Sequence, residues 1–271
     1  MTTSAKHLVV RLFNAFGLDI RRHRRPTPAR SSMTGALTQL ARLGFKPQTV
    51  IDVGVAYQTA ELYEAFRDAT VLLIEPLVEF EPFLRKVCGS YNARYILAAA
   101  GETSGNAVLN VRADRVGSSL LNEVEGHAVD SSPRTVPVIA IDDVCLERNL
   151  RGPFLIKVDV QGAELQVLAG AKRTLQETEA VILEVSLFGF WIGGPQFYDV
   201  IARMKEYGFV AYDFCDFLHR PFDNALCQVD MVFARENGLL RQSHVFATPE
   251  QMEVQVRETQ AQFAAMEKKS S

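Results

Sequence analysis

The sequence predicts an α/β fold: a Rossmann-like sheet of seven strands with helices on both faces, preceded by a short helical segment and followed by a helix. Two observations predict it. From residue 48 onward, short apolar runs rich in β-branched residues alternate with helical stretches, which is typical of parallel βαβ units. The runs are apolar almost throughout, as strands covered on both faces must be. Hydrophobic residues form 48% of the 271 positions, which is enough for such a core.

The elements of the sheet follow in order along the chain. The predicted strands are 49–54, 70–76, 93–100, 153–160, 180–187, 208–214 and 228–234. The helices predicted between them lie near 59–67, 79–88, 163–175 and 195–207. The stretch 105–141 differs, because two β-rich runs surround a polar loop. It predicts additional strands or a hairpin.

Both ends of the chain are predicted to be helical. Apolar residues at helical spacing predict one helix over 4–20 and a second over 32–43, with Gly44 where a helix commonly ends. Near the other end, Thr248 opens a capping box, and apolar residues then recur at helical spacing. We expect this last helix to dock on the core or on a second copy of the chain. The chain thus divides into an N-terminal helical segment with a basic linker, a main domain and a C-terminal helical tail, at 1–47, 48–235 and 236–271.

Composition excludes several classes of function. The formal net charge of −3 gives the molecule no general attraction for nucleic acid. The four cysteines lie far apart, and the five histidines lack metal-ligand spacing, so neither a disulfide framework nor a zinc site is predicted. Dispersed cysteines favour a reducing compartment, and the expected location is the cytoplasm.

The chain shows no sequence pattern of a membrane-spanning protein. Its apolar runs are much shorter than the roughly 20 residues that cross a bilayer. The apolar stretch 7–18 contains Arg11 and Asn14, which is atypical of a signal peptide. Four arginines within 21–25 follow the first predicted helix, so residues 4–25 are a candidate for peripheral contact with the inner face of an anionic membrane. The alternative is a helix packed on the core with a solvated basic linker.

Acidic residues end the first two predicted strands. Asp52 and Gly54 end the first, and a strand, glycine turn and helix present backbone N–H groups to a nucleotide. Glu75 ends the second, about 20 positions further on, where an acid accepts the hydroxyls of a ribose. Two acids suit a cofactor without phosphates, because Asp52 would repel a pyrophosphate. The pattern favours S-adenosylmethionine over a dinucleotide. An ordinary βα turn and a solvated carboxylate are the structural alternatives.

A lysine lies inside the fourth predicted strand. Burying Lys157 is costly unless the charge is paired, and strand alternation places it on the same side as Asp159. Asp159 would lie at the carboxyl end of the strand next to the first, at the switch point where ligands bind. We expect Asp159 to accept a proton, with Lys157 keeping it ionised and Glu164 as the alternative base. A purely structural ion pair explains the same pattern. Glu184, at the end of the next strand, would complete an acidic rim.

Several motifs of the sequence are those of a known family, in the family's order. They read DVGVAYQTAELY, LIEP, GSSL, VIAIDD, LIKVDVQGAELQVLAGA, VILEV and DMVF. Over roughly residues 48–234 the chain resembles the FkbM-type methyltransferases, and the KVDVQGAE block is the most specific part. The resemblance implies a seven-strand methyltransferase fold that uses S-adenosylmethionine to methylate oxygen, often on sugars of glycolipids, polysaccharides or natural products.

The resemblance also assigns residues. Asp52, Gly54 and Glu75 fall in its cofactor-binding motifs. Asp159 and Glu164 fall in the signature block, which does not separate their roles. The expected acceptor is therefore a small molecule or a glycan rather than a nucleic acid.

The remaining candidates are one residue that departs from the family pattern and three residues that we expect on the acceptor side of the site. Gln58 stands where related sequences usually have glycine, so it would crowd the methionine end of the cofactor or hydrogen-bond to it. The alternative function is therefore a non-catalytic binding or regulatory module with the same fold. Ser118 and Ser119 lie in a loop motif that recurs in the family, which implies contact with substrate or cofactor. Trp191 lies where a mobile loop would cover the acceptor, and it would either stack on a sugar or pack in the core.

Overall fold

The computed structural model describes residues 30–124 and 131–270. The helix predicted over 4–20 and the membrane contact assigned to 4–25 lie outside the described residues. The first described element is α2 (Met33–Arg42), which begins at the N-cap Ser32 and is followed by Gly44 at φ +89°. This confirms the second predicted helix.

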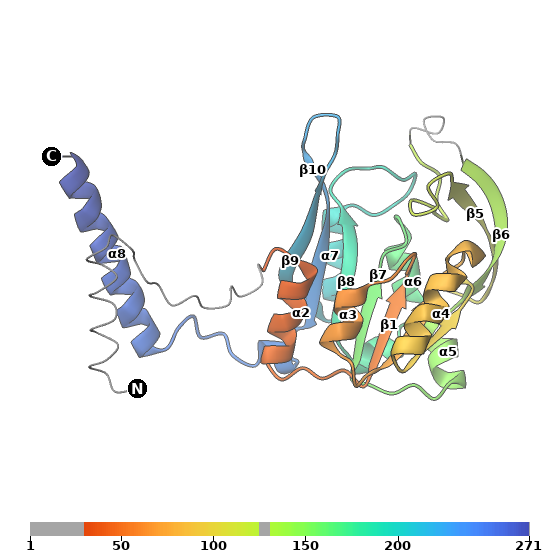
Figure 1. Ribbon diagram of the computed structural model, residues 1–271, viewed down its shortest axis with the longest axis horizontal. Helices are drawn as coiled ribbons and strands as arrows, with labels where there is room; N and C mark the ends of the chain where they lie inside the picture. The colour runs from red at the N-terminus through yellow and green to blue at the C-terminus, as the bar shows by residue number, and fades with distance from the viewer. Residues whose placement is uncertain (1–29, 125–130, 271) are drawn as a thin grey trace, which may run out of the picture.

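Seven strands form one sheet in the order β3-β2-β1-β7-β8-β10-β9, which confirms the predicted α/β fold (Figure 1). They are β1 (Thr49–Val53), β2 (Thr70–Ile74), β3 (Ala93–Ile96), β7 (Phe154–Val158), β8 (Thr178–Ser186), β9 (Phe209–His219) and β10 (Leu226–Arg235). The strands from β3 to β8 run parallel, and β10 is antiparallel to both of its neighbours. The strand order reverses between β1 and β7, so the switch point lies there.

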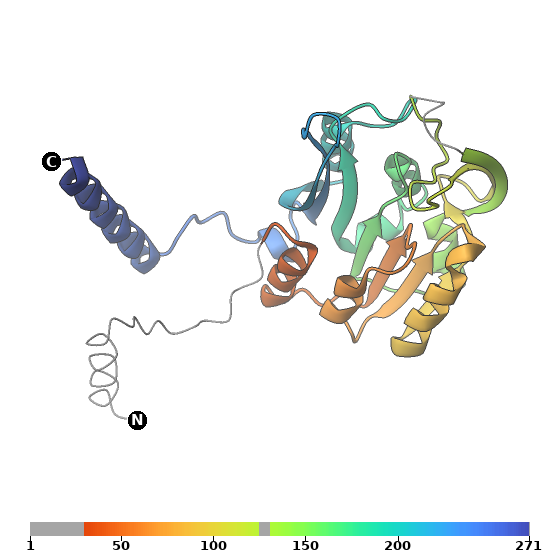
Figure 2. The same cartoon turned by 45° about the horizontal axis from the view of Figure 1, so that its top comes forward.

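Helices cover both faces of the sheet (Figures 1 and 2). One face carries α2, α3 (Ala60–Ala65) and α4 (Glu81–Ser90), and the other carries α5 (Ile141–Glu147), α6 (Glu164–Ala169) and α7 (Phe197–Glu206). Alternating strand residues enter the two cores: Val50 packs with the first helices, and Ile51 packs with the second. All five residues of β1 and of β7 are consequently buried, and most of them are apolar.

A second, smaller sheet lies beside the main one, in the order β4-β6-β5. Its strands are β4 (Ala99–Ala100), β5 (Gly105–Arg112) and β6 (Ser131–Ile139), and β5 and β6 pair antiparallel as expected for a hairpin. The predicted strand 93–100 is wrong as a single element, because its end leaves the main sheet to pair with β6. The inner face of this sheet packs on Leu77 and Phe80, beyond the end of β2.

The remaining elements are three short 3₁₀ turns and the last helix. The turns are η1 (Val78–Phe80), η2 (Thr174–Glu177) and η3 (Leu239–Arg241), and the helix is α8 (Pro249–Ser270). The predicted capping box is confirmed, since Thr248 N–H donates to Gln251 Oε1 at 2.9 Å and Gln251 N–H donates to Thr248 Oγ1 at 3.3 Å. Among the described residues, no helix is both long enough and apolar enough to cross a membrane.

The expectation that the last helix docks on the core is wrong. The side chains from 250 to 267 are exposed, and α8 lies apart from the body in both views. Its sequence is polar around most of its circumference, so it offers too little apolar surface to offset the ordering of its side chains. Contact with a second copy of the chain stays a prediction.

Candidate functional site

A cavity of about 810 Å³ lies where the carboxyl ends of β1, β2 and β7 face the second sheet. The ends of the three strands supply Gly54, Glu75 and Asp159, and the second sheet and its loop supply apolar and polar wall residues such as Leu109 and Ser118. The cavity lies at the switch point of the sheet, where the sequence predicts binding.

Gly54 allows the strand ends to meet at this cavity. Its φ is +78°, and a Cβ added there would lie 1.8 Å from the carbonyl oxygen of Asp159. Gly54 N–H donates to Ile74 O at 2.9 Å, and Asp159 N–H donates to Val53 O at 3.0 Å. The glycine is therefore required by the close approach of two chain segments as well as by its φ angle.

Glu75 lines the cavity and is held in place by backbone groups. Ala56 N–H donates to Oε2 and Leu77 N–H donates to Oε1, each at 2.9 Å. Burial raises the pKa of Glu75 to about 7, against the two backbone hydrogen bonds, which favour the charged form. Each oxygen retains a second lone pair that can accept a ribose hydroxyl.

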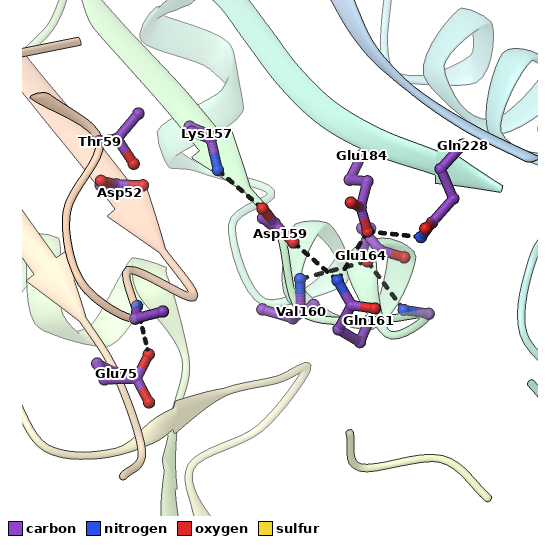
Figure 3. A network of polar contacts seen from close by, with 12 residues as sticks. Asp52, Thr59, Glu75, Lys157, Asp159, Val160, Gln161, Glu164, Glu184 and Gln228 are labelled. Atoms are coloured by element: carbon purple, nitrogen blue, oxygen red, sulfur yellow. Dashed lines mark hydrogen bonds and ion pairs between the residues drawn. The ribbon is translucent and has the colours of Figure 1, made fainter. Parts of the chain in front are cut away.

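Asp52 lies deeper and does not line the cavity. The Tyr63 hydroxyl donates to Asp52 Oδ2, whereas Oδ1 is buried with no hydrogen-bond partner among the described residues. Burial raises the pKa of Asp52, and the charge of Lys157 opposes that shift. Thr59 faces Asp52 in Figure 3, and both Thr59 and Lys157 line the cavity. Direct contact of Asp52 with a cofactor stays a prediction.

Lys157 and Asp159 form the ion pair that strand alternation suggested. Lys157 is 5% exposed, and its Nζ lies 3.2 Å from Asp159 Oδ2. Burial alone would lower the pKa of Lys157, but the charges of Asp159, Asp52 and Asp230 raise it well above its ordinary value. The lysine is therefore a permanent cation among three carboxylates.

Two glutamines complete the network on the β8 side of the site, and sequence reasoning missed both. Gln161 Nε2 donates to Asp159 Oδ1 at 3.1 Å and to Glu184 Oε2 at 2.8 Å (Figure 3). Gln228 Nε2 donates to the same Glu184 oxygen at 2.8 Å. Burial first, and then the charges of nearby acids, raise the pKa of Glu184 well above its ordinary value. The only sequence signal was the amide of Gln161 directly beyond a buried strand.

Glu164 stabilises the turn between β7 and α6. Its Oε1 accepts Gly162 N–H at 2.9 Å and Val160 N–H at 3.3 Å. The carboxyl group is buried, which raises the pKa of Glu164 to about 7, and it does not line the cavity. A role as alternative base stays a prediction that these contacts do not favour.

The candidate substrate serines occupy different positions. Ser118 lines the cavity, donates to Arg115 O at 2.7 Å and accepts Arg112 N–H at 3.1 Å. Ser119 is buried, and its hydroxyl donates to Gln161 O at 2.6 Å. Ser119 thus fixes the backbone of Gln161, and its contact with substrate stays a prediction.

Trp191 and Gln58 are the last two candidates. Trp191 is buried rather than exposed on a loop, because its ring packs where Gly162 lacks a side chain. Of the two interpretations of Trp191, the structure favours packing, and a stacking contact stays a prediction. Gln58 is exposed and lines the cavity, which stays open beside it.

The chemistry of the cavity fits S-adenosylmethionine. Apolar side chains such as Val53, Ile74 and Leu109 line it and suit an adenine, and the acids Glu75 and Asp159 suit ribose hydroxyls and the positive charges of the methionine end. These acids would repel a phosphate group. Two cations also line the cavity, and each is paired with an acid: Lys157 with Asp159 at 3.2 Å and Arg115 with Glu79 at 3.9 Å.

Comparisons with known proteins were made for the sequence and for the fold. The profile of the methyltransferase FkbM domain matches residues 52–211. A 54-residue segment is 44% identical to the 2-O-methyltransferase NoeI of Sinorhizobium fredii (strain NBRC 101917 / NGR234), and it covers 20% of this chain and 22% of that protein. The match thus spans about a fifth of the length of this relative.

Two solved methyltransferase structures align with this chain at low sequence identity. Magnesium protoporphyrin IX methyltransferase from Synechocystis PCC 6803, with bound S-adenosylmethionine, has a TM-score of 0.44 and 12% identity, covering 85% of this chain and 96% of that chain. Precorrin-6y C5,15-methyltransferase from Geobacter metallireducens GS-15 has a TM-score of 0.42 and 9% identity, covering 79% of this chain and 92% of that chain. The match to the FkbM profile covers more than half of the chain. The chain therefore belongs to the FkbM methyltransferase family, and its methyl donor is S-adenosylmethionine.

Proposed function

We propose that this protein transfers the methyl group of S-adenosylmethionine to a hydroxyl of a sugar, with Asp159 as the proton acceptor. The observation that carries the proposal is the position of Asp159: it lines the donor cavity, and both of its oxygens are held, by Lys157 and by Gln161. The relative from Sinorhizobium fredii is a 2-O-methyltransferase, which supports oxygen as the acceptor atom.

S-adenosylmethionine supplies, when bound, a methyl group that its sulfonium already activates. The protein has to orient the acceptor oxygen and take its proton. An alcohol is about as weak an acid as water, so a carboxylate cannot deprotonate it beforehand. As the oxygen forms its bond to the methyl carbon its proton becomes acidic, and Asp159 accepts that proton. Such general-base catalysis contributes roughly 10²–10⁴-fold to the rate.

The neighbours of Asp159 keep it ready for this step. Lys157 Nζ lies 3.2 Å from Asp159 Oδ2, and the amide of Gln161 fixes the direction of Oδ1. On the other side of the cavity, Glu75 is oriented to bind the ribose. The two sides together would align donor and acceptor.

The test measures transfer and cofactor binding on one variant. The wild type is incubated with S-adenosylmethionine that carries an isotope-labelled methyl group and with a panel of polysaccharides and glycolipids, and mass spectrometry of the hydrolysed sugars detects methyl ethers. Asp159→Asn keeps the shape and removes the proton acceptor, so we expect kcat to fall by about 10²-fold or more while the calorimetric Kd for S-adenosylhomocysteine stays within about twofold. Label on nitrogen or carbon, or an unchanged kcat, would contradict the proposal.

A second candidate is a binding or regulatory module without turnover. The observation that favours it is Gln58, whose side chain lines the donor cavity. This candidate predicts that the protein binds S-adenosylhomocysteine but forms no labelled product with any acceptor, even in a stoichiometric single-turnover reaction.

A further inference from the structure

A second cleft, of about 990 Å³, opens beside the donor cavity. It lies between the loop after β8, the end of β5 and the β9–β10 hairpin. The residues that carry the argument are Phe188, Phe190, Trp191, Arg112, Arg220 and Gln228. In Figure 1 the loop after β8 and the β9–β10 hairpin project beyond the carboxyl ends of the parallel strands.

One wall of this cleft is aromatic and firmly held. The rings of Phe188 and Phe190 lie 5.9 Å apart between centroids and are tilted by 33°. The Arg220 guanidinium covers Phe188 at 4.0 Å from the ring centroid, and two hydrogen bonds of 2.8 and 2.7 Å join it to Asp223. The wall therefore presents flat apolar surface of the kind that the C–H face of a pyranose covers.

The opposite rim is polar and supplies both donors and acceptors. Arg112 pairs with Glu123 at 3.2 Å, and the amides of Gln161 and Gln228 also line the cleft. Sugar hydroxyls both donate and accept hydrogen bonds, so they need both kinds of partner. Arg112 and Arg220 are each already paired with carboxylates, which favours a neutral sugar over an anionic one.

The cleft and the donor cavity meet where the side chain of Gln161 contacts that of Asp159. Gln161 lines the cleft, Asp159 lines the donor cavity, and the two side chains are joined at 3.1 Å. Trp191 is fixed beneath this junction, because a Cβ on Gly162 or on Gly194 would lie within 2.7 Å of it. Its indole Nε1 is buried without a hydrogen-bond partner among the described residues.

We propose that this cleft is the acceptor site, and that it binds a pyranose ring of a neutral glycan. The ring stacks on Phe190, and its reacting hydroxyl passes Gln161 to reach Asp159. The inference rests on the proposed function and adds the place and the chemical class of the acceptor.

Trp191 is the only tryptophan of the chain, so intrinsic tryptophan fluorescence reports on this cleft. The protein, saturated with S-adenosylhomocysteine, is applied to an array of neutral and anionic glycans, and each glycan retained is titrated while the tryptophan emission is followed. We expect a neutral glycan to bind and to shift the emission. Phe190→Ala should weaken that binding by about tenfold, with the calorimetric Kd for S-adenosylhomocysteine unchanged.

The matched control is Phe246→Ala, which removes an exposed phenylalanine outside the cleft and should bind as the wild type does. The inference is overturned if the array retains no glycan or only anionic ones, or if Phe190→Ala binds as tightly as the control. Failure of the proposed function looks different. A glycan would then bind in the cleft without gaining a labelled methyl ether, whereas failure of the inference alone leaves methyl transfer intact and insensitive to Phe190→Ala.

Discussion

The two sides of the donor cavity hold their carboxylates in different ways. On the β1–β2 side, Glu75 is fixed by the backbone amides of Ala56 and Leu77. On the β7–β8 side, Asp159 and Glu184 are fixed by side chains, those of Lys157 and the two glutamines. The first arrangement depends on the path of the chain and the second on individual side chains. Backbone contacts suit a binding surface that is common to many acceptors. Side-chain contacts suit a reactive group whose environment must be adjusted.

Removing the cation is the most direct test of the side-chain arrangement. Lys157→Met keeps much of the volume but leaves Asp52, Asp159 and Asp230 without their buried counter-charge. We expect the free energy of unfolding, measured in urea, to fall by about 3–5 kcal/mol. The control is Lys205→Met, which removes an exposed ion pair with Glu236 and should cost at most about 1 kcal/mol. Equal losses of unfolding free energy for the two variants would show that the buried cation contributes no more to stability than the exposed one.

The backbone arrangement is tested at the glycine that lets the strand ends meet. In Gly54→Ala the alanine would adopt an unfavourable φ of +78°, and its Cβ would lie 1.8 Å from a carbonyl oxygen. We expect a loss of about 2–5 kcal/mol, measured by thermal and urea unfolding. Gly44→Ala is the matched control, since Gly44 has a similar φ of +89° and a Cβ added there would meet nothing within 4 Å. It should cost only about 1–2 kcal/mol, and a loss as large as that of Gly54→Ala would assign the whole effect to φ.

The sequence predicted the backbone side of the site better than the side-chain side. The apolar runs TVIDV and FLIKV identify buried parallel strands, and the carboxyl ends of parallel strands meet at one edge. The positions of Gly54, Glu75 and Asp159 at one cavity follow from this rule alone. The Lys157–Asp159 pair follows as well, because both residues lie on one strand with an alternation of two.

The glutamine pair could not be predicted in this way. Gln228 reaches Glu184 because β10 folds back antiparallel onto β8, with Gln228 opposite Ser186, and that register is not encoded near either residue. Helix α5 has seven residues, and the sequence analysis did not predict it. The failure of α8 to dock has a different cause: its periodic spacing is real, but periodicity does not reveal how much apolar surface a helix needs to pack.

Burial of Glu75 predicts that the stability of the protein depends on pH. The pKa of Glu75 is about 7 in the folded protein and 4.5 in the absence of burial, so the unfolded chain loses this proton first as pH rises. The unfolded state then binds fewer protons than the folded state, and stability falls between about pH 4.5 and 7. In Glu75→Gln, the fall in the free energy of unfolding between about pH 4.5 and 7 should be smaller by about 1–3 kcal/mol, measured by urea unfolding at both pH values. The exposed Glu147→Gln is the control, and an unchanged slope for Glu75→Gln would mean that other buried acids cause the decline.

The smallest expected effect concerns Gln58, an exposed side chain that lines the donor cavity. Gln58 is exposed, and the cavity stays open beside it, so it has room to turn away from a bound methionine moiety. Gln58→Gly removes its contact with the ligand and also makes the loop before α3 more flexible, and these two effects oppose each other. We therefore expect the calorimetric Kd for S-adenosylhomocysteine to change by less than about tenfold, and kcat to stay close to that of the wild type. A much tighter Kd, together with methyl transfer that appears only in Gln58→Gly, would mean that the native side chain blocks the donor site. The backbone-held side of the cavity would then be the part that this protein has altered, and the non-catalytic candidate function would replace the proposed one.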